Sequence, residues 1–184
     1  MDKKMWIGLF IAFIMVFSIF GFIIDFAIQP TTQKMEYGDY TFTQTQQGYR
    51  AKVNGNEMLF LFFPGDLEYY TITDDTKQLL KAPVYTATYD PNSTIAPNLA
   101  EAQYYLEQQL QDIKYIERAL TNSTTLPQKT CADATTAQPV IELLQANVTT
   151  IITENNCIKV KAIDPYDLYR QTERIIYEIL GIIK

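Results

Sequence analysis

The stretch Cys157-Ile158-Lys159-Val160-Lys161-Ala162-Ile163, followed directly by Asp164-Pro165, decides the class of the fold. Its apolar and polar residues alternate, which predicts a β-strand with one buried face. Proline suits the first position of a helix, so Asp164-Pro165 predicts that a helix begins here. We expect this helix to pack on the sheet and to turn Arg170, Glu173 and Glu178 away from that contact. Its expected buried face follows three- and four-residue intervals and contains Leu168, Thr172, Ile175, Ile176, Ile179 and Ile183.

Hairpin signals dominate the first half of the chain. Tyr40-Thr41-Phe42-Thr43-Gln44 and Tyr49-Arg50-Ala51-Lys52-Val53 both alternate, and Asn54-Gly55 is a strong signal for a two-residue hairpin turn. The run Met58 to Phe63 is continuously apolar, as in a strand that is covered on both faces. Together these segments predict an antiparallel meander that ends at Pro64-Gly65.

Strands and helices follow in mixed order through the rest of the chain. Thr73-Asp74-Asp75 predicts the start of a short helix that runs through Leu80. Asn98 and Glu101 have the spacing of a capping box, which predicts a second amphipathic helix there. Its expected apolar stripe contains Leu99, Ala102, Leu106, Leu110 and Ile113. Further strands are expected at 84–89, 115–120, 140–144 and 148–152, with a long loop at 121–139. This order, with hairpins at both ends, predicts an α+β fold rather than a doubly wound one, with two amphipathic helices packed on sheet.

An apolar run, Met5 to Ile24, contains no charged side chain. At about 1.5 Å per residue it is long enough to span the hydrocarbon core of a bilayer as a helix. Lys3 and Lys4 precede it, which favours a cytoplasmic N-terminus. We therefore expect a cytoplasmic stub at 1–4, a transmembrane helix at 5–27 (Met5–Ala27), a stalk at 28–36 and one exported domain at 37–184. A cleaved secretory signal is the alternative, and it would export the same domain.

The charge and composition restrict the function. The chain has 15 basic and 21 acidic residues, a net charge of −6, and no histidine. An acidic surface repels phosphate backbones, so we expect no nucleic-acid partner. The lack of histidine removes the commonest general base and metal ligand and excludes a Ser-His-Asp or Cys-His arrangement. We expect no catalytic residue, no cofactor and no metal.

The two cysteines, Cys131 and Cys157, both lie in the expected exported domain. Two thiols without histidine make a poor zinc site, whereas they can form one disulfide in an oxidising compartment. In a redox pair two residues usually separate the cysteines, whereas 25 residues separate them here. Two free thiols, or bonds to another chain, remain the alternatives to an internal disulfide.

Several short motifs resemble one group of proteins when they are taken together. They are Tyr37-Gly38-Asp39-Tyr40-Thr41-Phe42, Gly48-Tyr49, Pro64-Gly65-Asp66-Leu67-Glu68-Tyr69, Asn156-Cys157-Ile158, and then Asp164, Leu168, Arg174 and Ile179-Leu180-Gly181-Ile182. With these, the chain resembles small uncharacterised archaeal proteins that have one N-terminal membrane helix and an exported domain with paired cysteines. The resemblance implies this topology and a disulfide, and it implies no activity.

Acidic residues offer two candidate sites, each with a simpler interpretation. Asp164 and Asp167 could form a catalytic pair, but they occupy the cap and third positions of the last helix, where they satisfy backbone N–H groups. A second acidic group could gather a calcium ion, but it lacks the spacing of a calcium loop, so we expect a solvated surface. This group contains Asp66, Glu68, Asp74 and Asp75.

Tyrosines and glycan acceptor motifs are the remaining candidates. Most of the 13 tyrosines, including Tyr40, Tyr49, Tyr85 and Tyr89, fit strand patterns and are expected to pack in the sheets. Those that could form an exposed, carbohydrate-stacking surface are Tyr69, Tyr70, Tyr104 and Tyr105. The sequence also has three glycan acceptor motifs, at Asn92, Asn122 and Asn147, all in expected loops or turns.

These features favour a non-enzymatic protein of the cell envelope. We expect it to be anchored in the cell membrane, with its domain outside, and to act through contacts with another envelope protein or a glycan. The alternative is an anchored hydrolase or transferase that uses carboxylates and tyrosines, as glycoside hydrolases do without histidine.

Overall fold

A computed structural model of the chain describes residues 6, 10, 11, 13–15, 17, 18 and 33–183. The chain divides into two compact units, Met1–Gln33 and Lys34–Lys184. Three α-helices, two short helical turns and two sheets make the second unit an α+β domain, as the sequence predicts.

The sequence predicts a membrane-spanning helix at residues 5–27, and the structure does not support it. In the part of the chain that the structure describes, no helix is long and apolar enough to cross a membrane. A crossing takes about 20 consecutive helical residues. Most of residues 5–27, together with the expected stub at 1–4 and part of the expected stalk at 28–36, lie outside the described residues.

The first sheet is an antiparallel meander of four strands in the order β1-β2-β3-β4. These strands are β1 (Lys34–Tyr37), β2 (Tyr40–Thr45), β3 (Gly48–Val53) and β4 (Asn56–Phe60). Asn54 and Gly55 both have positive φ, 50° and 89°, as the predicted two-residue turn requires. β1 was not expected, because its polar residues Lys34 and Glu36 resemble a stalk. Met35 and Tyr37, which alternate with them, are half-buried.

The second sheet has five strands in the order β6-β5-β7-β9-β8. They are β5 (Val84–Tyr89), β6 (Tyr115–Arg118), β7 (Val140–Gln145), β8 (Thr150–Glu154) and β9 (Cys157–Ala162). All pairs are parallel except β8 with β9, which form a hairpin at Asn155 and Asn156, both with positive φ. The expected hairpins at this end of the chain are thus reduced to one, because β9 lies between β7 and β8.

Two of the three predicted helix starts are confirmed. Thr73 caps α2 (Asp74–Leu79), and Asp164 caps α4 (Pro165–Ile179) by accepting from the backbone N–H of Asp167 at 2.9 Å. α3 (Ala96–Leu110) begins before Asn98 and has no side-chain cap. The expected capping box is therefore wrong.

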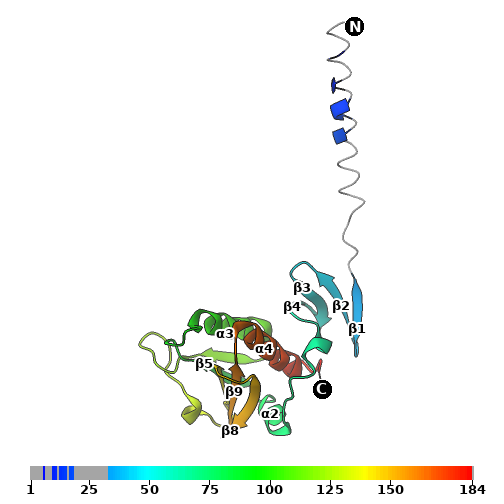
Figure 1. The fold of residues 1–184 in the computed structure, drawn as a ribbon. Coiled ribbons are helices and arrows are strands. Elements are labelled where there is room, and N and C mark those ends of the chain that lie inside the picture. Colours follow the sequence, from blue (N-terminus) through cyan, green and yellow to red (C-terminus); the bar gives the residue numbers. More distant parts are fainter. Residues whose placement is uncertain (1–5, 7–9, 12, 16, 19–32, 184) are drawn as a thin grey trace. The chain divides into compact units, whose positions relative to one another are not determined.

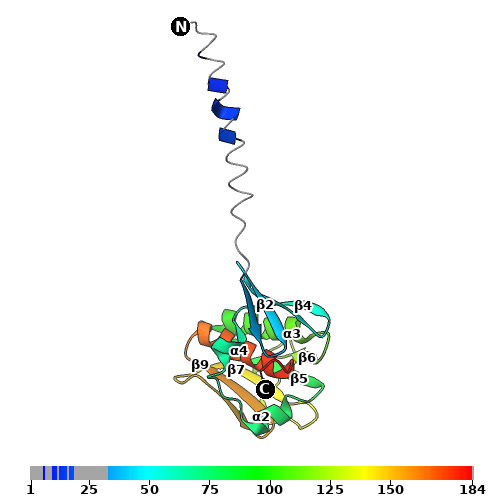
Figure 2. The same ribbon diagram turned by 90° about the vertical axis from the view of Figure 1, so that its right-hand side faces the viewer.

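α3 and α4 lie together on one face of the five-stranded sheet (Figures 1 and 2). The strand residues on this face are fully buried and in register across the sheet; they are Ala87, Ile141, Leu143, Ile158 and Val160. The other face is more polar, and the loop at 121–139 crosses it. Thr88 there donates to the carbonyl of Lys129 at 2.9 Å, and Gln138 donates to Thr86 at 3.0 Å. With α3 and α4 on the same face, and the loop with its helical turn η2 (Cys131–Asp133) on the other, the sheet is not doubly wound.

α4 is buried around most of its circumference, because the first sheet covers the side that the second sheet leaves free. The Tyr177 ring contacts the rings of Phe42 on β2 and Phe60 on β4, with centroids 6.2 and 4.7 Å away. Glu173, which the sequence pattern places away from the sheet, is completely buried, and Arg174 is 4% exposed. The polar side of this helix is therefore an interior surface.

The Glu173 carboxyl ties α4 to the segment that leaves the first sheet. Its two oxygens accept from the backbone N–H groups of Leu61 and Phe62, at 3.1 and 3.3 Å. Tyr177 donates to the carbonyl of Phe62 at 2.7 Å, so one short segment is bonded to two turns of the helix. Burial raises the pKa of Glu173 to about 8, although the two backbone N–H groups act in the opposite direction.

This raised pKa predicts that stability depends on pH through Glu173. A carboxyl with a higher pKa in the folded state contributes stability that is complete below its ordinary pKa of 4.5 and is lost as the pH rises through about 8. We expect the free energy of unfolding, measured by urea titration, to fall across that interval by several kcal/mol, at about 1.4 kcal/mol per pKa unit. Glu173→Gln, which resembles the protonated acid, should remove most of this slope. Glu36→Gln, at an exposed position, is the control and should keep it; an unchanged slope in Glu173→Gln would contradict the assignment.

Candidate functional site

Tyr69 and Tyr70 follow the short helical turn η1 (Pro64–Leu67), whose buried Leu67 anchors them to the core. The backbone N–H of Tyr70 donates to the carbonyl of Leu67 at 3.1 Å. The Tyr70 ring is buried (6% exposed), and the Tyr69 ring stacks beside it, 4.0 Å between centroids, with 61% of the residue exposed. One tyrosine therefore holds the other at the surface.

Asp167, in the first turn of α4, connects these tyrosines to the second sheet. Its Oδ1 accepts from the Tyr70 hydroxyl at 2.9 Å, and its Oδ2 accepts from the Thr149 hydroxyl at 2.6 Å. Burial raises the pKa of Tyr70 well above its ordinary value, and the Asp167 charge raises it further. Tyr70 consequently remains a neutral hydroxyl at any physiological pH, and both carboxylate oxygens are occupied.

A hollow of about 360 Å³ lies between these groups; we call it the tyrosine hollow. Its lining residues are Tyr69, Tyr70, Thr71, Thr149, Thr150, Ile151, Ile163 and Asp167. They offer aromatic and aliphatic surface, hydroxyl groups and one carboxylate, without a lysine or arginine. Such a lining can bind a ligand that has both an apolar face and hydroxyl groups.

Beside the tyrosine hollow, the Arg170 guanidinium packs against three aromatic rings. Its distances to the ring centroids are 4.8 Å for Tyr166, 5.6 Å for Phe62 and 5.9 Å for Tyr69. We call these four residues the arginine–aromatic cluster. Cation–π contacts of this kind are each worth about 0.5–1 kcal/mol at exposed sites. The cluster therefore restrains Tyr69, whose hydroxyl also accepts from the Arg170 guanidinium at 3.5 Å.

The structure brings only one of the two predicted tyrosine pairs to a hollow. Tyr104 lies on α3 with 51% of its surface exposed and lines neither the tyrosine hollow nor the arginine–aromatic cluster. Tyr105 is half-buried, and burial together with the neighbouring Glu173 raises its pKa. Its hydroxyl belongs to the interior rather than to a ligand surface.

The acidic residues considered for calcium take separate structural roles. Glu68 accepts from the hydroxyl of Tyr37 at 2.6 Å, and Asp74 and Asp75 occupy the first turn of α2. Asp66 lies in η1. The acceptor asparagines Asn92, Asn122 and Asn147 are all exposed in loops, where a transferase could reach them.

Several residues of the site were missed in the sequence. Tyr166 and Arg170 are one helical turn apart, a spacing that places them on one face of α4 and could have indicated their contact. Thr149 and Phe62 come from other parts of the chain, and no local pattern connects them with Asp167 or Arg170.

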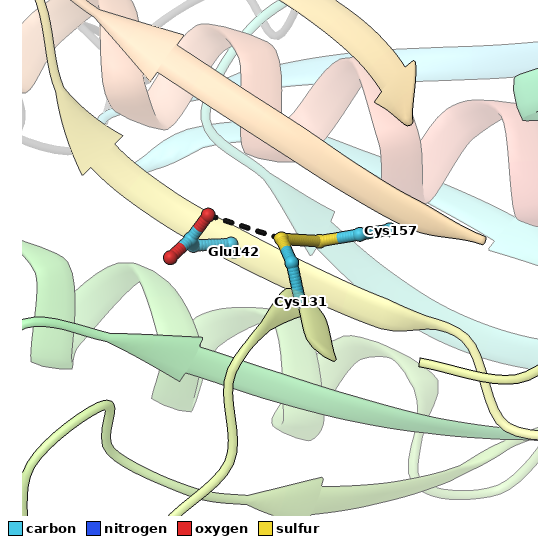
Figure 3. A group of neighbouring side chains, drawn as sticks. All are labelled: Cys131, Glu142 and Cys157. Atoms are coloured by element: carbon cyan, nitrogen blue, oxygen red, sulfur yellow. Dashed lines mark hydrogen bonds between the residues drawn. A yellow bond between two sulfur atoms is a disulfide. The ribbon is translucent and has the colours of Figure 1, made fainter. Parts of the chain in front are cut away.

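Cys131 and Cys157 form the predicted disulfide, with their Cα atoms 5.2 Å apart (Figure 3). It joins the helical turn η2 (Cys131–Asp133) to the start of β9. Oε2 of Glu142 lies 3.1 Å from the sulfur of Cys131. A disulfide sulfur carries no proton, so a hydrogen bond across this gap requires the protonated carboxyl, and burial favours that form by raising the pKa of Glu142.

These three side chains are also the described group best placed to hold a metal, since their ligand atoms lie within 4.8 Å of one another. Both sulfurs are bonded to each other, however, and the thiolate is the form that binds a metal. In its disulfide form the group therefore acts as a crosslink.

The disulfide should contribute measurably to stability. The two cysteines are separated by 26 positions, and closing a loop of this size stabilises a fold by roughly 3–4 kcal/mol on the chain-entropy model. Cys131→Ser and Cys157→Ser should each lower the free energy of unfolding by about this amount, and the double variant should lower it little further. Urea titration measures the change, with Thr124→Ser, at an exposed position of the same loop, as control. Ready alkylation of both thiols in the native, unreduced protein would disprove the crosslink.

The comparisons with known proteins do not indicate a function for this chain. No protein-family model matches the chain, and neither a curated protein nor a solved structure does. The chemistry of the tyrosine hollow and its surroundings is therefore the basis on which a function can be argued.

Proposed function

We propose that this protein is an exported, non-enzymatic binding protein of the cell envelope and that it binds a neutral glycan in the tyrosine hollow. The observation that carries the proposal is the exposed Tyr69 ring beside the hydrogen-bonded group of Tyr70, Asp167 and Thr149. The C–H face of a sugar ring packs on an aromatic face, while its hydroxyls exchange hydrogen bonds with the polar groups beside that ring. Tyrosine also supplies this contact at a low cost in side-chain entropy.

Export is supported by the crosslink between Cys131 and Cys157. Structural disulfides form and persist outside the reducing cytosol. The cell envelope is also where a protein meets glycans on cell surfaces and secreted partners. The disulfide and the lining of the tyrosine hollow are thus two separate observations that support the proposal.

Binding is favoured over glycoside hydrolysis by the chemistry of the hollow. Hydrolysis uses two carboxyl groups, one on each side of the scissile bond. The tyrosine hollow is lined by a single carboxylate, Asp167, and both of its oxygens already accept hydrogen bonds. This arrangement positions a ligand and lacks a second carboxyl for the acid and base steps.

A protein partner is the second candidate, and the arginine–aromatic cluster is the observation that favours it. Tyrosine and arginine are enriched among the residues that dominate protein–protein binding energy. Tyr166 is 56% exposed and adds aromatic surface beside Arg170. A partner that binds there would lie next to the tyrosine hollow.

The glycan proposal is tested by titrating the protein with neutral trisaccharides: cellotriose, chitotriose, maltotriose and mannotriose. We expect at least one of them to bind, and Tyr69→Ala to weaken its binding roughly tenfold, the loss of about 1.4 kcal/mol. Calorimetry gives the affinity, and amide chemical shifts give the location. Tyr104→Ala removes an exposed tyrosine that does not line the hollow, so it should bind as the wild type does.

Two results would count against the proposal. One is the failure of all four sugars to shift the amides of Tyr69, Tyr70 and Thr149. The other is an equal loss of affinity in Tyr69→Ala and Tyr104→Ala, because the aromatic contact would then not be specific to the hollow.

A further inference from the structure

We infer that the glycan site continues from the tyrosine hollow across Ile163 into a second hollow, so that its ligand is a linear oligosaccharide rather than a single sugar. This inference rests on the proposed function. The second hollow has a volume of about 560 Å³, and we call it the strand-end hollow. Its lining residues are Asp90, Asn92, Ser93, Thr94, Leu99, Leu143, Leu144, Gln145, Ala146, Asn147 and Ile163.

The strand-end hollow lies at the carboxyl ends of parallel strands. Residues 90–94 follow β5, Gln145 ends β7, and Ile163 follows β9. After β5 the chain continues through α3 to β6 on one side of the sheet, whereas after β7 it continues to β8 at the other edge. Neighbouring connections that diverge in this way leave a crevice beyond the strand ends, which is where open sheets of parallel strands usually bind ligands.

The two hollows adjoin each other at Ile163, which lines both and is 52% exposed. The connection between β7 and β8 also contributes to both, with Asn147 in the strand-end hollow and Thr149 in the tyrosine hollow. A chain-like ligand that leaves the Tyr69 ring can therefore cross the exposed aliphatic side chain of Ile163 and meet a second set of polar groups.

The strand-end hollow offers groups that suit sugar hydroxyls. The Thr94 hydroxyl donates to Oε1 of Gln145 at 2.6 Å, which orients the Gln145 amide. Among the described residues, no hydrogen bond uses the amide nitrogen of Gln145, so its two N–H donors can serve a ligand. Asp90 Oδ1 accepts from the backbone and side-chain nitrogens of Asn92, at 2.9 and 3.2 Å.

Charge also selects the ligand. The linings of the two hollows contain two carboxylates, Asp90 and Asp167, and neither a lysine nor an arginine. A phosphate, sulfate or uronic acid would meet like charge in these linings, and Arg170, the cation beside Tyr69, is packed against three aromatic rings. A neutral chain of hexose or N-acetylhexosamine units avoids this repulsion, and its hydroxyls can donate to the carboxylates and exchange hydrogen bonds with the hydroxyls and amides.

The test is the dependence of affinity on ligand length in the full chain. For the neutral sugar that binds, calorimetry is carried out with the linear series from disaccharide to hexasaccharide. We expect the affinity to rise about tenfold or more along the series, because the longer chains contact both hollows. Gln145→Ala should remove most of that gain and leave the disaccharide unchanged, whereas Tyr69→Ala should weaken every length. Gln46→Ala, in an exposed turn of the first sheet, is the control.

Amide chemical shifts provide a second reading that does not depend on any variant. The hexasaccharide should perturb residues 90–94 and 145–147 in addition to Tyr69 and Tyr70, and the disaccharide should perturb only the latter pair. If affinity is independent of length and residues 90–94 do not respond, the inference fails while the proposed function stands. If no neutral sugar of any length binds, the proposed function fails, and the extended site fails with it.

Discussion

The rest of the structure depends on the buried carboxyl of Glu173. It accepts from two consecutive backbone N–H groups, those of Leu61 and Phe62, at the point where the chain leaves the first sheet. An unpaired backbone donor in an apolar interior would cost about 1–3 kcal/mol, so this carboxyl offsets the cost of covering the two N–H groups with α4. Because the segment is held against α4, the first sheet covers the side of the helix that the second sheet leaves open, and the two sheets share one core.

The same helix carries most of the candidate site. Asp167, Arg170 and Glu173 follow one another at three-residue intervals, so they lie along one side of α4. Glu173 accepts a hydrogen bond from the backbone N–H of Phe62, the Phe62 ring packs against Arg170, and Arg170 packs against the Tyr69 ring. The exposed ring of the tyrosine hollow is thus connected by direct contacts to the buried carboxyl. A binding surface built on a helix that is fixed from both sides is preorganised, which reduces the entropy cost of binding.

Much of the fold was predictable because residues that are adjacent in the sequence specify several of its turns and helix starts. The turn at Asn54-Gly55, the cap at Asp164 and the α+β class follow from residues that are close together in the sequence. The order of the second sheet was not predictable in this way, because β9 pairs with β7 across an intervening strand. The Asn155-Asn156 turn could have indicated the one hairpin present, since asparagine tolerates positive φ better than most residues do.

The prediction that Glu173 is turned away from the buried side of α4 was wrong for a different reason. A helical pattern assigns charged residues to solvent, which holds only when one side of the helix is covered. Here the first sheet covers the other side, so Glu173 and Arg174 are both buried, and Glu173 is compensated by backbone donors that are distant in sequence. Arg174 instead donates to Glu178 one turn away, at 2.9 Å. The predicted tyrosine pairs illustrate the same limit, because Tyr69-Tyr70 and Tyr104-Tyr105 look alike in sequence and differ only in what the fold places beside them.

The distribution of charge over the domain bears on the choice of ligand. Three lysines, Lys77, Lys81 and Lys114, line a separate hollow beside α2, together with Asp74 and Glu178. Lys114 there donates to the backbone carbonyls of Lys81 and Ala82, so part of this positive charge serves the fold itself. The tyrosine and strand-end hollows are lined by no such cation. In a chain with a net charge of −6, an anionic ligand would meet more positive charge at the three lysines than beside Tyr69, where Arg170 is packed against aromatic rings. What the tyrosine hollow can offer a ligand is an aromatic face and hydroxyl groups, which together suit an uncharged, hydroxyl-rich chain.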